Sequence, residues 1–420
     1  MRYDLVVIGG GAMGLSTAYH AAREKLHTLV IEQFPLFNER MSSGGATRQF
    51  RVQYAEDYMA RLTLSSIPFW DELQAHSRVP LRSRVGSVWF GDPNVAASEG
   101  QIQGAMATLK ELKIPFETLD VQGIEHFGFA NVPPGYVGLF QADGGTINVA
   151  ATLQSLHAEA VASGFVTFMS SERVVALTAH EDGVLVRPST ETIDAPKVVI
   201  AAGPGSNDML RFLGIEVDIT IWQMASCYFR KRHADVDFPS WFVFEPEAAH
   251  YDPGAYYGFE EVDYACPGFV RVAPAFALQT FRDPAEATER PDPMDLLLTS
   301  RFVAAHMPGL DPEPRFPSRC LIGLPADPDR KMFLDLAPAS VPGHRNIAIS
   351  AAGWQFKFVP LVGKVCVDLV MRGRTDIDIS HFGISPAVPA VSAAVIPMAV
   401  PGTPLRALPA KRHSRRRIPF

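Results

Sequence analysis

The feature that most constrains the fold is a glycine-rich turn near the N-terminus, in the stretch DLVVIGGGAMGLSTAYHAA. Leu5–Ile8 form a continuous apolar run, which predicts a strand covered by helices on both faces. The spacing G-x-G-x-x-G follows at Gly9, Gly11 and Gly14, and residues 12–23 have helical character. Glycine allows the tight turn, lets the backbone approach a pyrophosphate and lets helix and strand pack closely. The order strand, turn and helix therefore predicts a dinucleotide site at the positive end of the helix dipole.

A second strand strengthens this interpretation. The stretch HTLVIEQF ends in Glu32, at the distance where a carboxylate meets the ribose hydroxyls of a bound dinucleotide. A glycine motif alone is weak evidence, and a βαβ unit that binds no nucleotide is the alternative. The combination of motif, second strand and acidic residue favours the binding site.

The segment after Glu32 helps to distinguish an NAD-binding fold from an FAD-binding fold. An NAD-binding fold would continue with regular βαβ units. This chain continues instead with a Ser/Gly loop and two arginines, Arg48 and Arg51, before an amphipathic helix. We interpret the i, i+3 spacing of the arginines as helical, and expect a second contact with the cofactor or an anion site. Two solvated arginines on a helix face are the alternative.

Two further apolar strands end in glycine turns, Val198–Ala201 before Gly203 and Ile347–Ala351 before Gly353. With the first strand they match a glutathione-reductase-like FAD-binding Rossmann domain, the α/β part of the fold, built from discontinuous segments. The segments between them are rich in aromatic residues, proline and alternating patterns, which predicts an α+β substrate domain with a mainly antiparallel sheet. The expected ranges are 1–81, 146–214 and 316–384 for the FAD-binding domain, and 82–145 and 215–315 for the substrate domain.

Charge and composition argue against several classes of function. The net charge of −7 gives no general attraction to nucleic acid or to an anionic membrane. The four cysteines are scattered without paired spacing, which argues against a disulfide scaffold or a metal site and fits a reducing compartment. We find no secretory signal and no apolar run of membrane-spanning length, and expect a cytoplasmic enzyme. Residues 385–420 are rich in proline and end in a basic cluster, which predicts a disordered tail, with a docking tail as the alternative.

One charged residue stands inside an apolar run. Lys357 lies in SAAGWQFKFVPLVG, among aromatic and aliphatic residues that otherwise indicate core. Burying an ammonium costs several kcal/mol unless an anion pairs with it or its pKa falls. We therefore expect Lys357 to face an anionic ligand. A core lysine that extends its charged end to water is the alternative.

Taken together, the motifs resemble one family. The resemblance extends from Tyr3 to about Ile384 and is carried by VVIGGGAMGLSTAYH, GSVWFGDPNVAASEGQI, YVGLFQADGGTINVAATL, YYGFE, SRCLIGLPADPDRKMFL and AAGWQFKFVPLVGK. The chain is similar to the sarcosine oxidase and N-methyltryptophan oxidase family of D-amino-acid-oxidase-like FAD amine oxidases. Within that family it most resembles the piperideine-2-carboxylate oxidase of nikkomycin biosynthesis. The glycine motifs are shared by many flavoproteins, whereas GSVWFGD, SEGQI and AAGWQFKFVP are more specific.

The resemblance implies an FAD-dependent oxidoreductase that acts on the CH–NH group of a secondary or cyclic amino or imino acid, such as piperideine-2-carboxylate or a pipecolate-like compound. Hydride would pass to the flavin N5, and dioxygen would reoxidise the flavin to give hydrogen peroxide. The partners are then a small-molecule substrate and dioxygen, and we expect a monomer without nucleic acid, membrane or metal. The alternatives are a sarcosine or N-methyl amino acid oxidase, a dehydrogenase with another electron acceptor, and a flavin-binding protein without turnover.

The resemblance also assigns site residues. It places Cys320 where FAD is attached covalently through a thioether, for which a buried free thiol is the alternative. Arg51 and Lys357 would hold the substrate carboxylate, since a guanidinium is a natural bidentate partner for it. The expected catalytic residues are Lys357, Arg51, Trp354, Tyr257 and Glu99. The expected cofactor-binding residues are Gly9, Gly11, Gly14, Glu32, Gly45, Thr47, Arg48, Val174, Gly203, Cys320, Gly353 and Lys357.

Two of these residues carry specific expectations, and two other positions depart from the family. Trp354 is expected to stack near the flavin or on a substrate ring, and Glu99 is either an acidic pocket residue or an exposed loop glutamate. Ala275 stands where sarcosine oxidase has a histidine and the piperideine carboxylate oxidase an aspartate, which leaves the substrate open. Arg271 stands near the position of an oxygen-activating lysine, so that role would need another cation.

Overall fold

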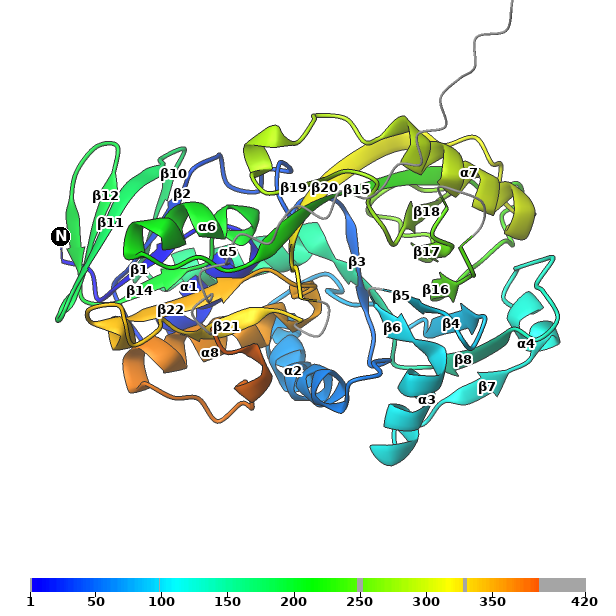
Figure 1. Cartoon of the computed structure of the whole chain (residues 1–420), viewed down its shortest axis with the longest axis horizontal. Helices are drawn as coiled ribbons and strands as arrows, with labels where there is room; N and C mark the ends of the chain where they lie inside the picture. Colours follow the sequence, from blue (N-terminus) through cyan, green and yellow to red (C-terminus); the bar gives the residue numbers. More distant parts are fainter. Residues whose placement is uncertain (1, 98, 248–251, 328–330, 385–420) are drawn as a thin grey trace, which may run out of the picture. The chain divides into compact units, whose positions relative to one another are not determined.

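The computed structural model describes residues 2–97, 99–247, 252–327 and 331–384, which fall in one compact unit (Figure 1). The predicted disordered tail, 385–420, lies outside the described residues. Two large sheets dominate the described part of the chain. Each is built from segments that are far apart in the sequence.

The first sheet has six strands and contains the strand that leads into the glycine-rich turn. Its order is β10-β2-β1-β14-β22-β21, and all neighbours are parallel except β21, which runs antiparallel to β22. The bounds are β1 Leu5–Ile8, β2 Thr28–Glu32, β10 Val166–Ser170, β14 Val198–Ile200, β21 Phe333–Leu336 and β22 Ile347–Ala351. The three strands predicted to end in glycine turns, β1, β14 and β22, are direct neighbours, so their carboxyl ends form one edge.

The two faces of this sheet are covered by different elements. Leu5 and Val7 pack against the helices α1 (Ala12–Arg23) and α8 (Val359–Arg372), whereas Val6 and Ile8 pack against a small antiparallel sheet. That sheet consists of β11 Val174–His180, β12 Gly183–Pro188 and β13 Ile193–Ala195. The expectation of helices on both faces is therefore wrong for one face, where short strands supply the apolar cover.

The helices on the other face are tied together by buried polar contacts as well as by apolar packing. Their bounds are α1 Ala12–Arg23, α2 Asp57–Ala75, α5 Val149–Ala162 and α8 Val359–Arg372, and α6 Ser206–Leu210 follows β14. Helix α1 lies against α5 and α8 (Figure 1). The His20 ring Nε2 donates to the carbonyl oxygen of Pro360 at 2.7 Å. Burial lowers the pKa of His20 to about 3, so the ring is neutral in the folded protein.

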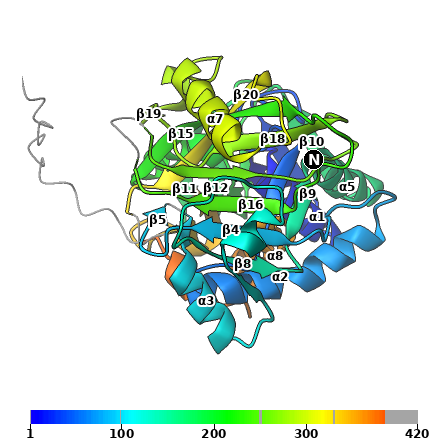
Figure 2. The ribbon, with the colours of Figure 1, turned by 90° about the vertical axis from the view of Figure 1, so that its right-hand side faces the viewer.

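The second sheet is nine-stranded and mainly antiparallel. Its order is β19-β15-β18-β17-β16-β4-β8-β7, with β20 paired to β15, and β4 runs parallel to β16. The bounds are β4 Ser87–Gly91, β7 Glu117–Leu119, β8 Val137–Gln141, β15 Ile219–Arg230, β16 Ser240–Phe244, β17 Ala255–Gly258, β18 Phe269–Pro274, β19 Thr280–Phe281 and β20 Arg315–Pro325. One face packs against α4 Val121–Glu125 and α7 Pro293–His306, and the other against α3 Ile102–Glu111. Figure 2 shows α7 and α3 on opposite sides of this sheet.

Two short ribbons complete the described part of the chain. Strand β3 Thr47–Phe50 pairs antiparallel with β9 Gly145–Asn148, and β5 Ala96–Ala97 pairs with β6 Gly100–Gln101. The helical interpretation of the two arginines is wrong. Arg48 lies in the extended strand β3 opposite Ile147, Arg51 follows that strand directly, and α2 begins only at Asp57.

The predicted elements around the glycine turns are otherwise confirmed. The strand 5–8, the helix 12–23 and the strand 347–351 have the expected bounds, and β14 is one residue shorter than expected. The division into two domains stays a prediction, although β20 pairs with the nine-stranded sheet while most of it falls in the range 316–384 assigned to FAD binding. Across the described ranges, no helix is long and apolar enough to cross a membrane, and no group of three potential ligands could hold a metal ion.

Candidate active site

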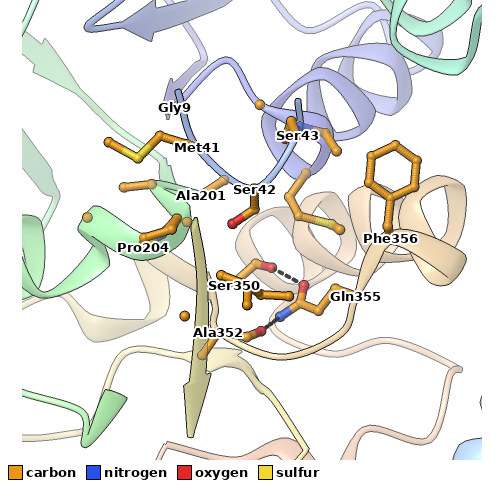
Figure 3. A pocket seen from close by; sticks show the side chains of 18 of the residues that line it. Gly9, Met41, Ser42, Ser43, Ala201, Pro204, Ser350, Ala352, Gln355 and Phe356 are labelled. Atoms are coloured by element: carbon orange, nitrogen blue, oxygen red, sulfur yellow. Dashed lines mark hydrogen bonds between the residues drawn. The ribbon is translucent and has the colours of Figure 1, made fainter. Parts of the chain in front are cut away.

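A cavity opens at the carboxyl edge of the six-stranded sheet and is lined by both large sheets. Gly9, Ala201 and Ser350, from the ends of β1, β14 and β22, surround one end of it (Figure 3). Phe242 of β16 and Tyr257 of β17 line it from the nine-stranded sheet. The cavity therefore lies where open α/β sheets commonly bind their ligands.

The glycine turn forms a wall without side chains. Gly9 has a φ of +107°, and a Cβ there would lie 2.4 Å from the carbonyl oxygen of Ala201. A Cβ at Gly14 would lie 1.8 Å from the carbonyl oxygen of Gly9, so only glycine allows α1 to pack this close to the turn. Gly11 precedes the first residue of α1, and the positive end of the helix dipole faces the cavity.

Glu32 is held in one orientation at the end of β2. One carboxylate oxygen accepts from the backbone N–H of Gly10 at 2.7 Å and the other from the N–H of Phe34 at 3.0 Å. The side chain lines the cavity and is largely buried. The bare turn, the helix N-terminus and this fixed carboxylate fit the pyrophosphate and ribose of a dinucleotide.

The turn after β22 is held by a glutamine. Ser350 Oγ donates to Gln355 Oε1 at 2.9 Å, and the Gln355 side-chain amide donates to the carbonyl oxygen of Ala352 (Figure 3). Ala352 and Gly353 both have positive φ, +57° and +87°, and a Cβ at Gly353 would lie 2.2 Å from the carbonyl oxygen of Lys331. The turn directs the following residues, including Trp354, to the cavity wall.

A buried charged group closes the other end of the cavity. Arg51 is 1% exposed and donates to the carboxylate of Glu99, and its guanidinium carbon lies 4.2 Å and 4.6 Å from the ring centroids of Tyr54 and Trp89. Lys357, in the short 3₁₀ turn Phe356–Phe358 before α8, is 6% exposed, and its Nζ lies 5.3 Å from the centroid of Tyr54. The solvated-arginine and exposed-glutamate alternatives are therefore wrong for Arg51 and Glu99, because both side chains are enclosed.

The protonation of this group follows from burial and mutual charge. Burial, and then the charge of Arg51, lower the pKa of Lys357 to about 7, and Glu99 only partly opposes them. Burial alone would raise the pKa of Glu99, but the charges of Arg51 and Lys357 outweigh it and hold that pKa below its ordinary value. When Lys357 is protonated, two cations thus face one carboxylate, and this excess of positive charge favours the binding of a second anion.

Arg48 is committed to the backbone of the Ser/Gly loop. One terminal nitrogen donates to the carbonyl oxygens of Ser42 and Gly44 at 2.7 Å and 2.6 Å, and the guanidinium lies 5.6 Å from the ring of Phe356. Burial lowers the pKa of Arg48. Arg48 therefore fixes the shape of the loop that lines the cavity, and Arg48 is itself one of the lining residues.

The nine-stranded sheet contributes an aromatic wall. The rings of Phe242 and Tyr257 are nearly parallel at 13°, with centroids 6.4 Å apart, and Phe259 lies edge-on to Tyr257. Ala275 is buried and lines the cavity next to them, where a polar side chain would have reached the interior. Such a wall favours a flat or cyclic apolar group.

Most of the predicted site residues converge on this cavity. The predicted residues that line it are Gly9, Gly11, Glu32, Arg48, Arg51, Glu99, Val174, Gly203, Tyr257, Gly353, Trp354 and Lys357. The predicted residues outside the lining are Gly14, Gly45, Thr47 and Cys320. Thr47 accepts two hydrogen bonds from Arg271, at its carbonyl oxygen and its Oγ1, so this arginine supports β3.

Sequence reasoning missed several lining residues, and Gln49 and Gln355 are two polar examples with a clear structural role. Gln355 carried no recognisable signal, because its partners belong to a turn that only the folded chain defines. Gln49 stands between the two arginines, and an extended interpretation of that segment would have placed it on the same face as Arg51.

Comparisons with known proteins identify the family of the chain. The chain matches the DAO family, described as FAD dependent oxidoreductase, over residues 4–369. It is 30% identical to the peroxisomal sarcosine oxidase of Homo sapiens over 396 residues, which cover 91% of this chain and 96% of that protein. It is also 32% identical over 405 residues to a longer Dictyostelium discoideum protein, of which the chain spans only 37%.

Solved structures give the same relationship. NikD, an unusual amino acid oxidase essential for nikkomycin biosynthesis, has in its open form a TM-score of 0.87 and 37% identity, with 92% of this chain and 98% of that chain covered. The glycine oxidase of Geobacillus kaustophilus shares the fold, with a TM-score of 0.71 and 15% identity over 91% of this chain and 98% of that chain.

The chain therefore belongs to the DAO family of FAD-dependent oxidoreductases. Within that family it is an amine or amino acid oxidase of the type represented by sarcosine oxidase and NikD. The family resemblance, the fold class and the assignment as an FAD-dependent oxidoreductase are confirmed.

Proposed function

We propose that the protein oxidises the C–N bond next to the carboxylate of a secondary or cyclic amino or imino acid, of the piperideine-2-carboxylate or pipecolate type. The observation that carries this proposal is the pair of buried cations, Arg51 and Lys357, that face an aromatic-walled cavity beside a dinucleotide-binding turn. The cations suit a carboxylate, and the aromatic wall suits a ring.

FAD would lie along the carboxyl edge of the six-stranded sheet. The residues that we propose to hold it are Gly9, Gly11, Gly14, Glu32, Gly45, Thr47, Arg48, Val174, Gly203, Gly353 and Lys357. Bound FAD supplies the electron sink of the reaction, since it takes a hydride equivalent from the substrate and its reoxidation by dioxygen gives hydrogen peroxide.

Arg51 would hold the substrate carboxylate, with Lys357 as a second cation. The guanidinium is held in place, because it donates to Glu99 and its carbon lies 4.2 Å and 4.6 Å from the ring centroids of Tyr54 and Trp89. Its present anionic partner is Glu99, which the substrate carboxylate would displace or share. The substrate carboxylate would thereby bind at a guanidinium that already pairs with a carboxylate, that of Glu99.

The same cations help the substrate nitrogen to bind without a proton. A protonated nitrogen cannot support departure of hydride from the neighbouring carbon, so the amine has to be neutral. Arg51 and protonated Lys357 disfavour a third positive charge in the cavity, which lowers the pKa of a bound ammonium. Lys357, with a pKa of about 7, can hold or release a proton near neutral pH. A cation in this position also stabilises negative charge as electrons pass to dioxygen.

Cys320 is our candidate for covalent attachment of FAD. It lies in β20 with its side chain half-buried, and two residues further on Ile322 lines the cavity. Gly323 also lines the cavity, so this part of β20 borders the proposed FAD site, and Cys320 lies two residues before Ile322.

A sarcosine or N-methyl amino acid oxidase is the second candidate. It is favoured by the 30% identity to the human peroxisomal sarcosine oxidase, whereas Ala275 departs from both enzyme types and favours neither. A dehydrogenase with another acceptor is the third. We also propose a monomeric, cytoplasmic enzyme, which light scattering and cell fractionation would test.

The deciding experiment is a substrate screen with purified holoenzyme. Pipecolate, piperideine-2-carboxylate, sarcosine and other N-methyl amino acids are mixed with the enzyme without oxygen, and bleaching of the flavin band is followed. Air is then admitted, and peroxide release is measured. Bleaching by cyclic compounds with rapid reoxidation supports the proposal, preference for sarcosine supports the second candidate, and slow reoxidation supports a dehydrogenase.

A further inference from the structure

Gln49 is a cavity residue that the proposed reaction does not yet use. It lies in β3 opposite Thr146 of β9, between Arg48 and Arg51 in the sequence. Alternation along the strand directs it away from Arg48, which turns to the Ser/Gly loop, and toward the side that bears Arg51. Gln49 therefore belongs to the substrate end of the cavity.

The orientation of its side-chain amide is fixed. The Nε2 group donates to the carbonyl oxygen of Trp241 at 2.8 Å and to that of Gly258 at 3.1 Å. Both neighbours are carbonyl oxygens that can only accept, so the amide nitrogen has to face them. The opposite rotamer would bring Oε1 against two acceptors and leave the carbonyls without their donor.

The remaining polar atom, Oε1, is consequently an acceptor presented to the cavity. No described residue donates to it, and it is not sealed in the interior as the oxygens of buried, unpartnered glutamines such as Gln53 are. Gln49 itself is half-buried and lines the cavity. A ligand that fills this space must offer Oε1 an N–H or O–H group or leave it unpaired.

The strand that carries Gln49 is anchored from both sides. Arg271 donates to the carbonyl oxygen and to Oγ1 of Thr47 at 2.7 Å and 2.8 Å. On the partner strand, Thr146 donates to the buried carboxylate of Glu260, which also accepts from Ser83 Oγ at 2.5 Å. The ribbon that carries this acceptor is thus held by polar contacts to Arg271 in β18 and to Glu260, which follows β17. A recognition group requires such support.

We propose that Gln49 is a specificity-determining residue whose Oε1 accepts a hydrogen bond from the N–H of the substrate amine. This inference rests on the proposed function and narrows its substrate class. Neutral primary and secondary amines carry an N–H, whereas neutral tertiary amines carry none. An uncharged amide acceptor also suits a neutral amine, because a carboxylate in its place would favour the ammonium form.

The test compares two flat ring carboxylates that differ mainly in the ring heteroatom group, pyrrole-2-carboxylate with an N–H and furan-2-carboxylate with an oxygen. Dissociation constants are measured on the holoenzyme from the change in flavin absorbance. Wild type is expected to bind the pyrrole about tenfold more tightly, the effect of one uncharged hydrogen bond. In Gln49→Met the ratio should fall to about one, through weaker binding of the pyrrole.

Ser83→Ala is the matched control, because it removes one hydrogen bond to Glu260 and keeps both hydrogen bonds that orient the Gln49 amide. This variant should have a lower free energy of unfolding and the same ratio of the two dissociation constants as wild type. A ratio near one in wild type, or an unchanged ratio in Gln49→Met, overturns the role of Gln49 even if both rings bind. If Gln49→Met does not fold, the wild-type ratio still decides. Failure of both rings to bind a flavin-loaded enzyme would overturn the proposed carboxylate site itself.

Discussion

Replacing Lys357 by methionine should stabilise the protein and weaken its active site at once. Burial and the nearby guanidinium lower the Lys357 pKa from 10.5 to about 7, so the empty folded protein holds this charge at a cost. At about 1.36 kcal/mol per pKa unit, the shift corresponds to at most about 5 kcal/mol. Methionine fills a similar space among the same aromatic rings without a charge.

The effect on stability depends on pH in a defined window. Between pH 7 and 10.5 the unfolded chain binds more protons at Lys357 than the folded protein does, so wild-type stability rises with pH across that range. Below pH 7 the full cost is present. The methionine variant should therefore exceed wild type in free energy of unfolding at low pH and converge with it toward pH 10.5.

Binding should change in the opposite direction. A lost charged partner costs roughly 1.5–3 kcal/mol, which corresponds to about 10- to 150-fold weaker binding of a carboxylate inhibitor. Titration of the flavin absorbance with such an inhibitor measures this, and denaturant unfolding at several pH values measures stability. If inhibitor affinity stays within about twofold while stability rises, Lys357 is only a buried core lysine and the carboxylate role is refuted.

Three further outcomes test other parts of the molecule. Cys320→Ala should release all flavin into the supernatant on acid precipitation, whereas wild type should retain a yellow pellet; equal release from both would contradict covalent attachment. Glu99→Gln removes the anion that competes for Arg51, and carboxylate inhibitors should then bind about fivefold more tightly in the same absorbance titration. Burial lowers the pKa of His20 to about 3, so its contribution to stability is full above pH 6.5 and is lost as pH falls toward 3. In His20→Gln, acid unfolding followed by circular dichroism should be less steep over that window, and an unchanged slope would show that another group is responsible.

The parts of the fold that sequence could predict are those governed by local chemistry. The strand 5–8, the glycine turn and the helix 12–23 follow from sterics within one short stretch, and they appear with the expected bounds. The arginine pair failed for the opposite reason. Spacing i, i+3 fits a helix, but Arg48 is held extended by β9, about a hundred residues away in the chain.

Long-range partners also explain what was missed in the site. The two carbonyls that fix Gln49 lie 192 and 209 residues further along the chain, so no local pattern reveals them. The pairing of β20 with β15 is of the same kind, since it depends on a strand that lies far away in the sequence. By contrast, Lys357 was recognisable, because a charge within an aromatic run is anomalous before any fold is known.

The short strand β3 places neighbouring residues on opposite sides, with Arg48 toward the Ser/Gly loop and Gln49 toward the nine-stranded sheet. Inserting or deleting a single residue here would exchange the two sides at every position that follows. Loop and cavity would then each receive the wrong donors and acceptors. Natural variants therefore cannot gain or lose a residue in this segment without disrupting the site. New substrate preferences have to arise by replacing side chains at fixed positions.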